Sequence, residues 1–486
     1  MTELNRKYLS RRISLFHLIF VTATISLLQS CSSAQLYPWH TQKLTEEFTV
    51  EKADEVKTFA DYLALEDRLF KQLDEKVYAQ SETGPEYRLD RYSTGSAADP
   101  RKLETNWNRS FELTTEQPRG GVLLLHGMSD SPYALRTLGK ALHRKGFWVV
   151  GMRMPGHGTA PSGLRYIDRH DLAAAVRIGM SHLDNKVNGK PVHMVGYSTG
   201  APLAVEFALD ALDEKSSPVP ASLVLVSPAI GIHAAAGAAS FKDSMSNLPG
   251  LGRWAYLNLQ PEFDPFKYNS FATNAADIVH TLTRSVASRL QQRAAANPDV
   301  ILPPTIVFKS TVDATVTTNA VIDSLLMRLH ANRHELVLFD INRYAVATRM
   351  LIDDPAPLTD RVMHADDLPF AVTLVTNENP QTTQVISQYK KPFSDEVSST
   401  REQGVSWPPG IVSLSHVALP IAPDDPLYGR RAPDNDDFIF LGQMAIQGEL
   451  GLLQIPTDWM IRLRYNPFYD YLESRMLKWI DATGNE

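Results

Sequence analysis

Short apolar runs alternate with amphipathic stretches through the middle of this 486-residue chain. The runs have the length and composition of buried strands, and they occupy residues 122–125, 147–150, 191–195, 222–226, 305–308 and 335–339. Between several of these runs the apolar residues recur at helical spacing, most clearly over residues 168–187. This alternation predicts an α/β fold, with a mostly parallel sheet and helices on both of its faces.

The first thirty residues predict a secretory signal peptide. Four basic residues between positions 6 and 12 precede a stretch, 13–28, that has no Lys, Arg, Asp or Glu and is short for a membrane span. Residues 28–31 read Leu-Gln-Ser-Cys, which resembles a bacterial lipobox and implies lipidation of Cys31. Ser32 after that cysteine is typical of an outer-membrane address. We therefore expect a lipid anchor in the bacterial cell envelope; the alternative is an ordinary cleaved signal followed by a stray cysteine.

Residues 31–106 are expected to hold a polar tether, up to about residue 47, and an amphipathic helix over about 50–78. The apolar residues of this helix fall at helical spacing among many charges: Phe59, Tyr62, Leu63, Leu69, Phe70, Leu73 and Val77. We expect the helix to pack on the core domain, which spans residues 107–486. A helix that binds a partner protein is the alternative.

Composition and charge exclude several classes of protein. The formal net charge of −7 leaves no basic stripe, so no nucleic-acid partner is expected. Cys31 is the only cysteine, which excludes a disulfide framework and a cysteine-based zinc site. The chain contains no HExxH motif, no Walker A loop and no GxGxxG after a strand. No metal or nucleotide cofactor is therefore expected.

A candidate nucleophile lies at residues 196–200, which read Gly-Tyr-Ser-Thr-Gly and match the nucleophile elbow G-x-S-x-G. The motif places a serine on a turn so tight that a side chain two residues before or after it would obstruct the backbone. A strand-like run precedes Ser198 and a helical stretch follows it, with Pro202 in the first turn of the helix. This setting favours a nucleophilic Ser198 over an inert Gly-Ser-Gly turn.

Three motifs together resemble the α/β-hydrolase superfamily. They are Leu-Leu-Leu-His-Gly at 123–127, Pro-Gly-His-Gly-Thr at 155–159 and the elbow at 196–200, and they occur in the order that the superfamily has. The branch that they resemble most contains monoacylglycerol lipases, lysophospholipases and small bacterial carboxylesterases. The resemblance covers about residues 119–228. It implies the fold and the serine nucleophile, and it does not single out a substrate.

The order Ser, acid, His in this fold directs the search for the catalytic base to the C-terminal part of the chain. Of the histidines beyond residue 300, only His416 directly follows a strand-like run, at 411–415. His330 and His334 lie in or beside a predicted helix, and His364 lies in an irregular region. His416 is therefore the predicted base, the alternative being a loop histidine bonded to backbone.

Two aspartates are candidates for the residue that orients His416. Asp313 follows the strand predicted at 305–308 and lies in Asp-Ala-Thr-Val, which resembles the acid loop of the superfamily. Asp340 also ends a predicted strand and is closer to His416 in sequence. We favour Asp313, and the long separation from His416 then requires an insertion between the two residues.

The resemblance also implies an oxyanion hole and a lid. The backbone N–H groups of Met128 and Thr199 are the expected oxyanion donors, while His126 and His157 are expected to support loops. A lid is expected over residues 231–284, with a plain surface insertion as the alternative. Residues 343–410 form a second insertion, too long for a bare loop, before the predicted C-terminal histidine. Phe468, Leu472, Met476 and Trp479 predict a C-terminal helix packed on the sheet.

These observations predict a serine hydrolase that cleaves carboxylic esters of small molecules or lipids through an acyl-serine intermediate. His416 would deprotonate Ser198, and Asp313 would orient the imidazole. A serine aminopeptidase and an acyltransferase are alternatives, because both use the same triad on the same fold. A non-catalytic surface binding protein is a further alternative, although it would not need these three residues in this order.

Overall fold

The computed structural model of the chain describes residues 35–214, 218–231, 252–296, 302–329, 333–346, 348–434, 438–442 and 457–484. The expected signal peptide and Cys31 lie outside these residues. The chain divides into two compact units, Met1–Tyr37 and Pro38–Glu486, and the second unit contains every element discussed below. Within the described ranges, no helix combines the length and the hydropathy that crossing a membrane requires.

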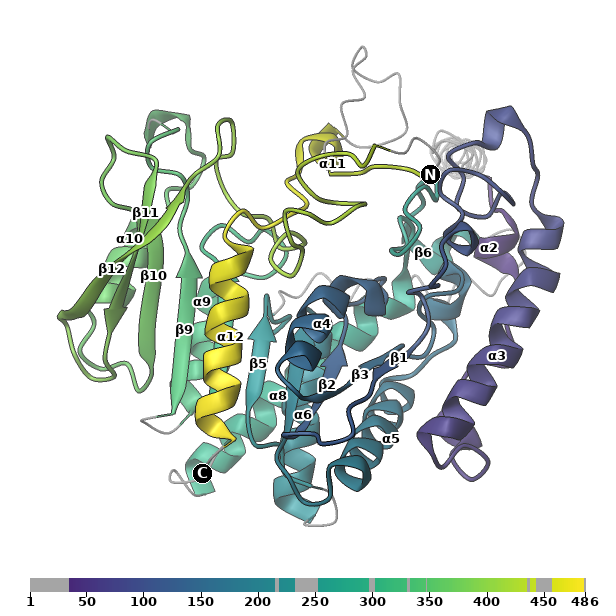
Figure 1. Cartoon of the computed structure of the whole chain (residues 1–486), viewed down its shortest axis with the longest axis horizontal. Helices are drawn as coiled ribbons and strands as arrows, with labels where there is room; N and C mark the ends of the chain where they lie inside the picture. Colours follow the sequence, from purple (N-terminus) through teal and green to yellow (C-terminus); the bar gives the residue numbers. More distant parts are fainter. Residues whose placement is uncertain are drawn as a thin grey trace, which may run out of the picture. The chain divides into compact units, whose positions relative to one another are not determined.

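Ten strands of the described residues form one sheet, in the order β1-β3-β2-β4-β5-β8-β9-β10-β11-β12 (Figure 1). Neighbouring strands from β3 to β10 are parallel, and β1, β11 and β12 pair antiparallel at the two edges. The strands are β1 Phe111–Leu113, β2 Gly121–Leu125, β3 Trp148–Met152, β4 Val192–Tyr197, β5 Leu223–Val226, β8 Thr305–Ser310, β9 His334–Phe339, β10 Ala371–Asn377, β11 Gln384–Lys390 and β12 Val397–Ser406. The predicted mostly parallel sheet is confirmed.

Helices cover both faces of the sheet, because its central strands are apolar on both sides. Leu124 of β2 faces α4, where a Cβ on Gly139 would lie 2.8 Å from its side chain, and the adjacent Leu123 faces α5 in the same way at Gly179. The C-terminal helix α12 packs in the same core cluster as α4. The α-helices are α2 Pro38–Thr41, α3 Phe59–Lys76, α4 Arg136–Arg144, α5 Arg169–Val187, α6 Gly200–Glu214, α8 Thr273–Ala296, α9 Thr318–Ser324, α10 Ala356–His364, α11 Thr457–Ile461 and α12 Tyr469–Thr483. This is the α/β-hydrolase fold that the motifs predicted.

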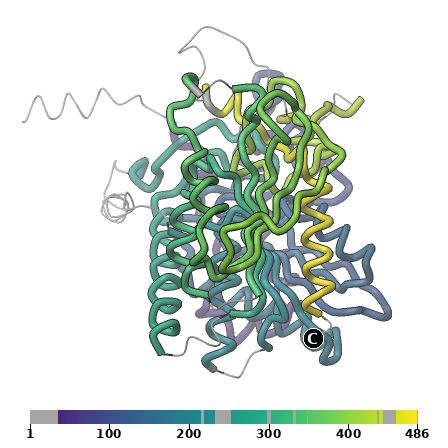
Figure 2. Tube along the Cα trace, turned by 90° about the vertical axis from the view of Figure 1, so that its left-hand side faces the viewer, coloured from purple at the N-terminus to yellow at the C-terminus, as the bar shows by residue number. Residues whose placement is uncertain are grey.

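The region predicted as a second insertion extends the central sheet. Helix α10 leads into β10, which pairs parallel to β9, and β11 and β12 then continue the sheet to its edge. Figure 2 views the molecule from this edge, with these strands in green nearest the viewer. Because β10 occupies the position beside β9, residues 343–410 complete the parallel sheet and add an antiparallel hairpin to it.

The strand predicted at residues 411–415 is absent, and this prediction is wrong. The segment is irregular, because β10 already pairs with β9 at the place where a further parallel strand would join. Its backbone groups bond to loops and side chains instead. The carbonyl of Val412 accepts from the N–H of Asn342 at 2.7 Å, and the carbonyl of Leu414 accepts from Ser310 Oγ at 2.8 Å.

The predicted lid contains two different kinds of structure. Residues 232–251 of it lie outside the described residues. Residues 252–272 include the short antiparallel pair β6 Tyr256–Asn258 and β7 Phe271–Ala272. From Thr273 the chain forms α8, which packs on α6 and leads to β8, so this helix belongs to the core. The predicted boundary at residue 284 is therefore too late by about three turns of helix.

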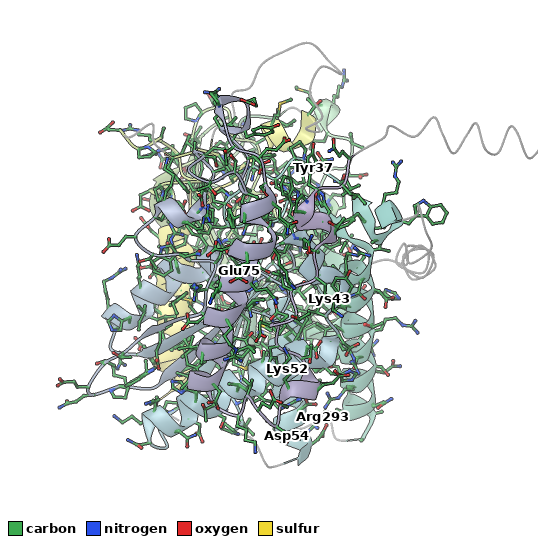
Figure 3. All side chains as sticks on the ribbon, turned by 90° about the vertical axis from the view of Figure 1, so that its right-hand side faces the viewer. Tyr37, Lys43, Lys52, Asp54, Glu75 and Arg293 are labelled. Atoms are coloured by element: carbon green, nitrogen blue, oxygen red, sulfur yellow. The ribbon has the colours of Figure 1, made fainter. Side chains whose placement is uncertain are left out.

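The N-terminal helix α3 begins at Phe59, after a short 3₁₀ turn at Val50–Lys52. Thr58 caps it in a reciprocal capping box with Asp61, which explains the later start. The hydroxyl of Tyr62 donates to the carbonyl of Arg153 at 2.7 Å, so the helix packs on the core. Figure 3 shows the outer side of this region, where the exposed Glu75 lies on α3.

Buried ion pairs fix the N-terminal segment to the loop after β3. The Arg153 side chain has no solvent exposure and bonds to Glu47 and Glu66, each at 2.9 Å. Losing Arg153 would leave two largely buried carboxylates without their counter-ion, which is costly. Trp39 is also buried, at 5% exposed. From Pro38 onward the structure therefore differs from the polar tether that the sequence suggested.

Candidate active site

Ser198 lies on the turn between β4 and α6 in a left-handed backbone conformation, with φ of 52°. Both neighbouring glycines are required by close backbone contacts. A Cβ on Gly200 would lie 2.0 Å from the carbonyl oxygen of Leu125, and one on Gly196 would lie 2.5 Å from the carbonyl oxygen of Gly200. A serine held at positive φ is a strained residue of the kind that concentrates at functional sites. The predicted elbow therefore has the required geometry.

His416 connects Ser198 to Asp313. Its Nε2 lies 2.9 Å from Ser198 Oγ, and its Nδ1 lies 2.7 Å from Asp313 Oδ2. A carboxylate only accepts, so Nδ1 carries the proton and Nε2 is left to accept from the serine hydroxyl. The three side chains come from the end of β4, the loop after β8 and the loop 411–422. The structure thus brings together all three residues that the sequence singled out.

Asp313 is held by four donors. Its Oδ1 accepts from the backbone N–H groups of Thr315, at 2.8 Å, and Val316, at 3.1 Å. Its Oδ2 accepts from His416 and from the ammonium group of Lys309. Burial alone would raise the pKa of Asp313, but the hydrogen bond from His416 and the charge of Lys309 hold it well below its usual value. The acid is therefore ionised and immobile.

Lys309 is a part of the site that the sequence reasoning missed. Its side chain has no solvent exposure, and its ammonium group also donates to the carbonyl of Val316 at 2.7 Å. Burial lowers the pKa of Lys309, and the adjacent Asp313 opposes that shift. A lysine inside an otherwise apolar strand, four residues before the acid, is the signal that could have revealed it.

The protonation state of His416 follows from the same surroundings. Burial lowers the pKa of His416, the hydrogen bond and charge of Asp313 raise it, and the cations of Lys309 and Lys267 lower it further, with a net downward shift. The imidazole is consequently neutral near pH 7 and able to accept a proton. This is the state that a general base needs.

Asp340, the alternative acid, belongs to a different group of residues. Its carboxylate bonds to Arg343, at 2.9 Å, and to the hydroxyl of Thr376, also at 2.9 Å. His416 has its bond to Asp313 instead. Asp340 therefore lies at the carboxyl end of β9, in contacts with Arg343 and Thr376.

Met128 and Thr199 border the serine, as expected for an oxyanion hole. Both line the same cavity as Ser198, and Gly127 lies so close that a Cβ on it would be 2.9 Å from the Cβ of Ser198. Within the described part of the chain, the N–H groups of Met128 and Thr199 have no protein acceptor. His126 accepts from the N–H of Met154 at 3.0 Å, and so supports the neighbouring loop.

The cavity beside Ser198 has a volume of about 340 Å³. Ser198 and His416 lie in its wall together with an apolar group of residues: Ala229, Leu257, Phe271, Ala276 and Val279. Most of this group comes from the region predicted as a lid and from the first turns of α8. An enclosed apolar wall beside a nucleophile suits a hydrocarbon chain. Among the described side chains, no three His, Cys, Asp or Glu gather as metal ligands would.

The sheet and the arrangement of the site are those of the α/β-hydrolase fold. Ser198 on its strained elbow after β4, the ionised Asp313 after β8 and the neutral His416 in the loop 411–422 meet in the chain order of this fold.

Comparisons with known proteins agree with this class. Residues 116–340 match the family model described as Hydrolase_4, serine aminopeptidase, S33. The thermostable monoacylglycerol lipase of Bacillus sp. (strain H-257) is 26% identical to this chain over 230 residues, which are 47% of this chain and 83% of that protein.

Two solved structures match about half of this chain. The monoacylglycerol lipase of Paleococcus ferrophilus is 17% identical, with a TM-score of 0.37 over 48% of this chain and 88% of that one. A structure described with LipS and LipT, two metagenome-derived lipolytic enzymes, is 19% identical, with a TM-score of 0.39 over 48% of this chain and 87% of that one. The family match ends at residue 340, before the segment that carries His416.

Proposed function

We propose that this protein is a serine hydrolase that cleaves carboxylic esters through an acyl-serine intermediate. The observation that carries the proposal is the hydrogen-bonded chain Ser198–His416–Asp313, which opens into a cavity with an apolar wall. The relatives whose names describe monoacylglycerol lipases support an ester substrate with an acyl chain.

The geometry suits acyl transfer in two steps. His416 Nε2 takes the proton of Ser198 Oγ as the oxygen attacks the ester carbonyl, and the N–H groups of Met128 and Thr199 stabilise the oxyanion that forms. The same proton then passes from His416 to the leaving alcohol as the ester C–O bond breaks. In the second step His416 removes a proton from water, which attacks the acyl-serine, and the proton returns to Ser198 as the acid departs.

An aminopeptidase is a second candidate, because the matching family model carries that description. Such an enzyme needs a carboxylate to bind the free α-amino group of its substrate. The structure describes two carboxylates that line this cavity or the one adjoining it, Asp130 and Asp264. Asp130 already faces Lys267, and Asp264 already faces Arg464. This pairing favours the ester over the peptide.

The test is hydrolysis of p-nitrophenyl esters of increasing chain length, compared with aminoacyl anilides. The wild-type protein should hydrolyse the esters, and Ser198→Ala should lower kcat by about 10⁶-fold, as removal of a triad serine does in subtilisin. Ser181→Ala, at an exposed position of α5, is the matched control and should keep full activity. Faster cleavage of the anilides than of any ester would move the protein to the aminopeptidases.

We also propose that the mature protein begins at Cys31 and is held in the cell envelope by lipid. The support is the lipobox-like sequence at 28–31 and the absence of any other cysteine. Intact mass of the protein extracted from membranes tests this proposal. An unmodified N-terminus on a soluble product would contradict it.

A further inference from the structure

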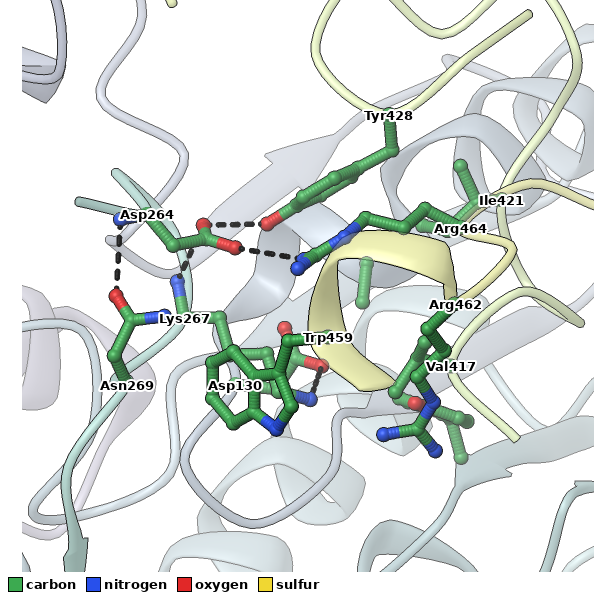
Figure 4. Close-up of a pocket in the computed structure, with 12 residues that line it drawn as sticks. Asp130, Asp264, Lys267, Asn269, Val417, Ile421, Tyr428, Trp459, Arg462 and Arg464 are labelled. Carbon is green, nitrogen blue, oxygen red and sulfur yellow. Dashed lines mark hydrogen bonds and ion pairs between the residues drawn. The ribbon is translucent and has the colours of Figure 1, made fainter. Parts of the chain in front are cut away.

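The cavity beside Ser198 has two chemically different sides. The apolar residues Leu257, Phe271, Ala276 and Val279 line this cavity alone. Asp130, Lys267 and Arg462 line both this cavity and a smaller adjoining one of about 50 Å³, which Figure 4 shows. These charged residues are therefore shared with the adjoining cavity, whereas the four apolar residues are not. We call the part of the site next to the adjoining cavity the charged side.

Two of the three cations on the charged side face a carboxylate. Lys267 Nζ lies 3.4 Å from Asp130 Oδ2, and Arg464 Nη1 lies 3.6 Å from Asp264 Oδ2. Asp264 also accepts from the hydroxyl of Tyr428 at 2.6 Å. Figure 4 marks these contacts with dashed lines. Each of the two cations is consequently balanced within the protein.

Among the described residues, Arg462 has no such partner. Its guanidinium donates to Thr315 Oγ1 at 3.5 Å, which is the outer limit of a hydrogen bond, and no carboxylate of the described residues lies within 4 Å of it. In Figure 4 the group points away from Arg464 and Asp264. A partly buried guanidinium presents five N–H donors and favours a planar or tetrahedral anion.

The position of Arg462 relates this unbalanced charge to the reaction. Its contact, Thr315, is two residues from Asp313 and lines the same cavity as His416. An ester bound with its acyl chain on the apolar wall would direct its alcohol part to the charged side. A negative group on that alcohol would then meet Arg462, whereas a positive group would be repelled.

We propose that the site selects carboxylic esters whose alcohol part carries an anionic group, with Arg462 as its main contact. Lys267 contributes less, because Asp130 already balances its charge. A phosphate or a carboxylate would satisfy the guanidinium, and a phosphate would use more of its donors. This inference rests on the proposed ester hydrolysis and adds the substrate class to it.

Short butyryl esters test the proposal without the complication of micelles. The kcat/KM values are compared for the monobutyryl esters of glycerol 3-phosphate, glyceric acid, glycerol and choline, which present a phosphate, a carboxylate, no charge and a cation. The wild-type protein should prefer the phosphate ester over the glycerol ester by about tenfold to a hundredfold, and the choline ester should be the poorest substrate. The glyceric acid ester should lie between the phosphate and glycerol esters.

Arg462→Gln should bring the ratio of phosphate to glycerol ester close to one, and Arg462→Lys should retain part of it. Arg431→Gln is the control, because Arg431 is exposed and lies outside both cavities; its ratio should equal that of the wild type. Higher ionic strength should reduce the wild-type ratio.

Three results would overturn the proposal. Equal kcat/KM values for the phosphate, glycerol and choline esters, with p-nitrophenyl butyrate hydrolysed, would remove the anion preference and leave the esterase function intact. A preference that survives in Arg462→Gln would remove the role of this arginine. No hydrolysis of p-nitrophenyl butyrate would overturn the proposed function and this inference together.

Discussion

The nucleophile and its base are built in two different ways. The conformation of Ser198 is encoded by a five-residue motif, because glycines at 196 and 200 permit a turn that a side chain at either position would obstruct. His416 is placed by contacts from distant parts of the chain, and 103 residues separate it from Asp313. The comparison shows that a short motif can encode a reactive conformation, while the partner that activates it depends on the packing of the whole sheet.

Several distant elements hold the loop of His416. Ser310 at the end of β8 donates to the carbonyl of Leu414 at 2.8 Å, and Ser415 donates to the carbonyl of Leu463 at 2.5 Å. Ser227, after β5, donates to the carbonyl of His416 itself at 3.4 Å. The imidazole therefore stays in place only if the C-terminal region packs correctly against the central strands.

The largest effect is expected from Asp313→Asn, which changes the residue that orients His416. The amide cannot hold the imidazole in the required tautomer or stabilise its cation, so kcat should fall by about 10⁴-fold, as in serine proteases. Asp340→Asn is the matched control, and it should change kcat by less than about tenfold. Both variants are assayed with p-nitrophenyl butyrate after circular dichroism shows equal folding. The opposite ranking would move the acid to Asp340.

A smaller effect is expected at the nucleophile, from Gly127→Ala in the loop after β2. The added Cβ would lie 2.9 Å from the Cβ of Ser198, so the serine or the loop must shift by a few tenths of an ångström. Displacement of a nucleophile on this scale should lower kcat by about tenfold to a hundredfold. Thermal unfolding provides the control, because a fall in kcat at an unchanged Tm locates the effect at the site. An unchanged kcat would show that the local geometry is tolerant.

The features that short sequence motifs encode could mostly be predicted. The elbow, the parallel strands and the fold class followed from runs of apolar residues and from glycine spacing, which act over a few neighbouring residues. Asp313 could be chosen because it directly follows β8. His416 was chosen for a reason that the structure does not support, since the expected strand before it is an irregular segment.

Other features of the fold and the site could not be predicted, because they depend on segments that are distant in sequence or only weakly patterned. Strand β12 is an edge strand with many polar and exposed residues, and the adjacent β11 is also rich in polar residues, so the alternation that marks a buried strand is weak in both. The charges around Arg462 come from segments about 200 and 330 residues away along the sequence. Pairings of this kind carry no local signal.

The smallest expected effect is a shift of the pH profile in Lys309→Met. This shift tests the electrostatic coupling between Asp313, Lys309 and His416. Lys309 lowers the pKa of His416, so removing this cation should raise it. The active form has neutral His416, and kcat/KM falls as the pH drops through that pKa. The acidic limb of the kcat/KM profile should therefore move to higher pH by about half to one unit.

The charged groups that face His416 are Asp313, Lys309 and Lys267, and only Lys309 is changed in this variant. Lys391→Met, at an exposed position after β11, controls for the loss of a lysine and should leave the profile unchanged. A Lys309→Met profile that coincides with the wild type above pH 7 and departs from it below fits the expected electrostatic effect. A uniform loss of activity at every pH would assign Lys309 a structural role only.

Labelling with a fluorophosphonate, followed by mass spectrometry of the digested protein, tests the central claim most directly. The reagent reacts with a serine only when a nearby base activates the hydroxyl. We expect a single phosphonyl adduct on Ser198 in the wild-type protein, and labelling slowed by several orders of magnitude in His416→Gln. An adduct on another serine, or equal labelling rates of Ser198 in the two proteins, would contradict the assignment of Ser198 and His416 as nucleophile and base.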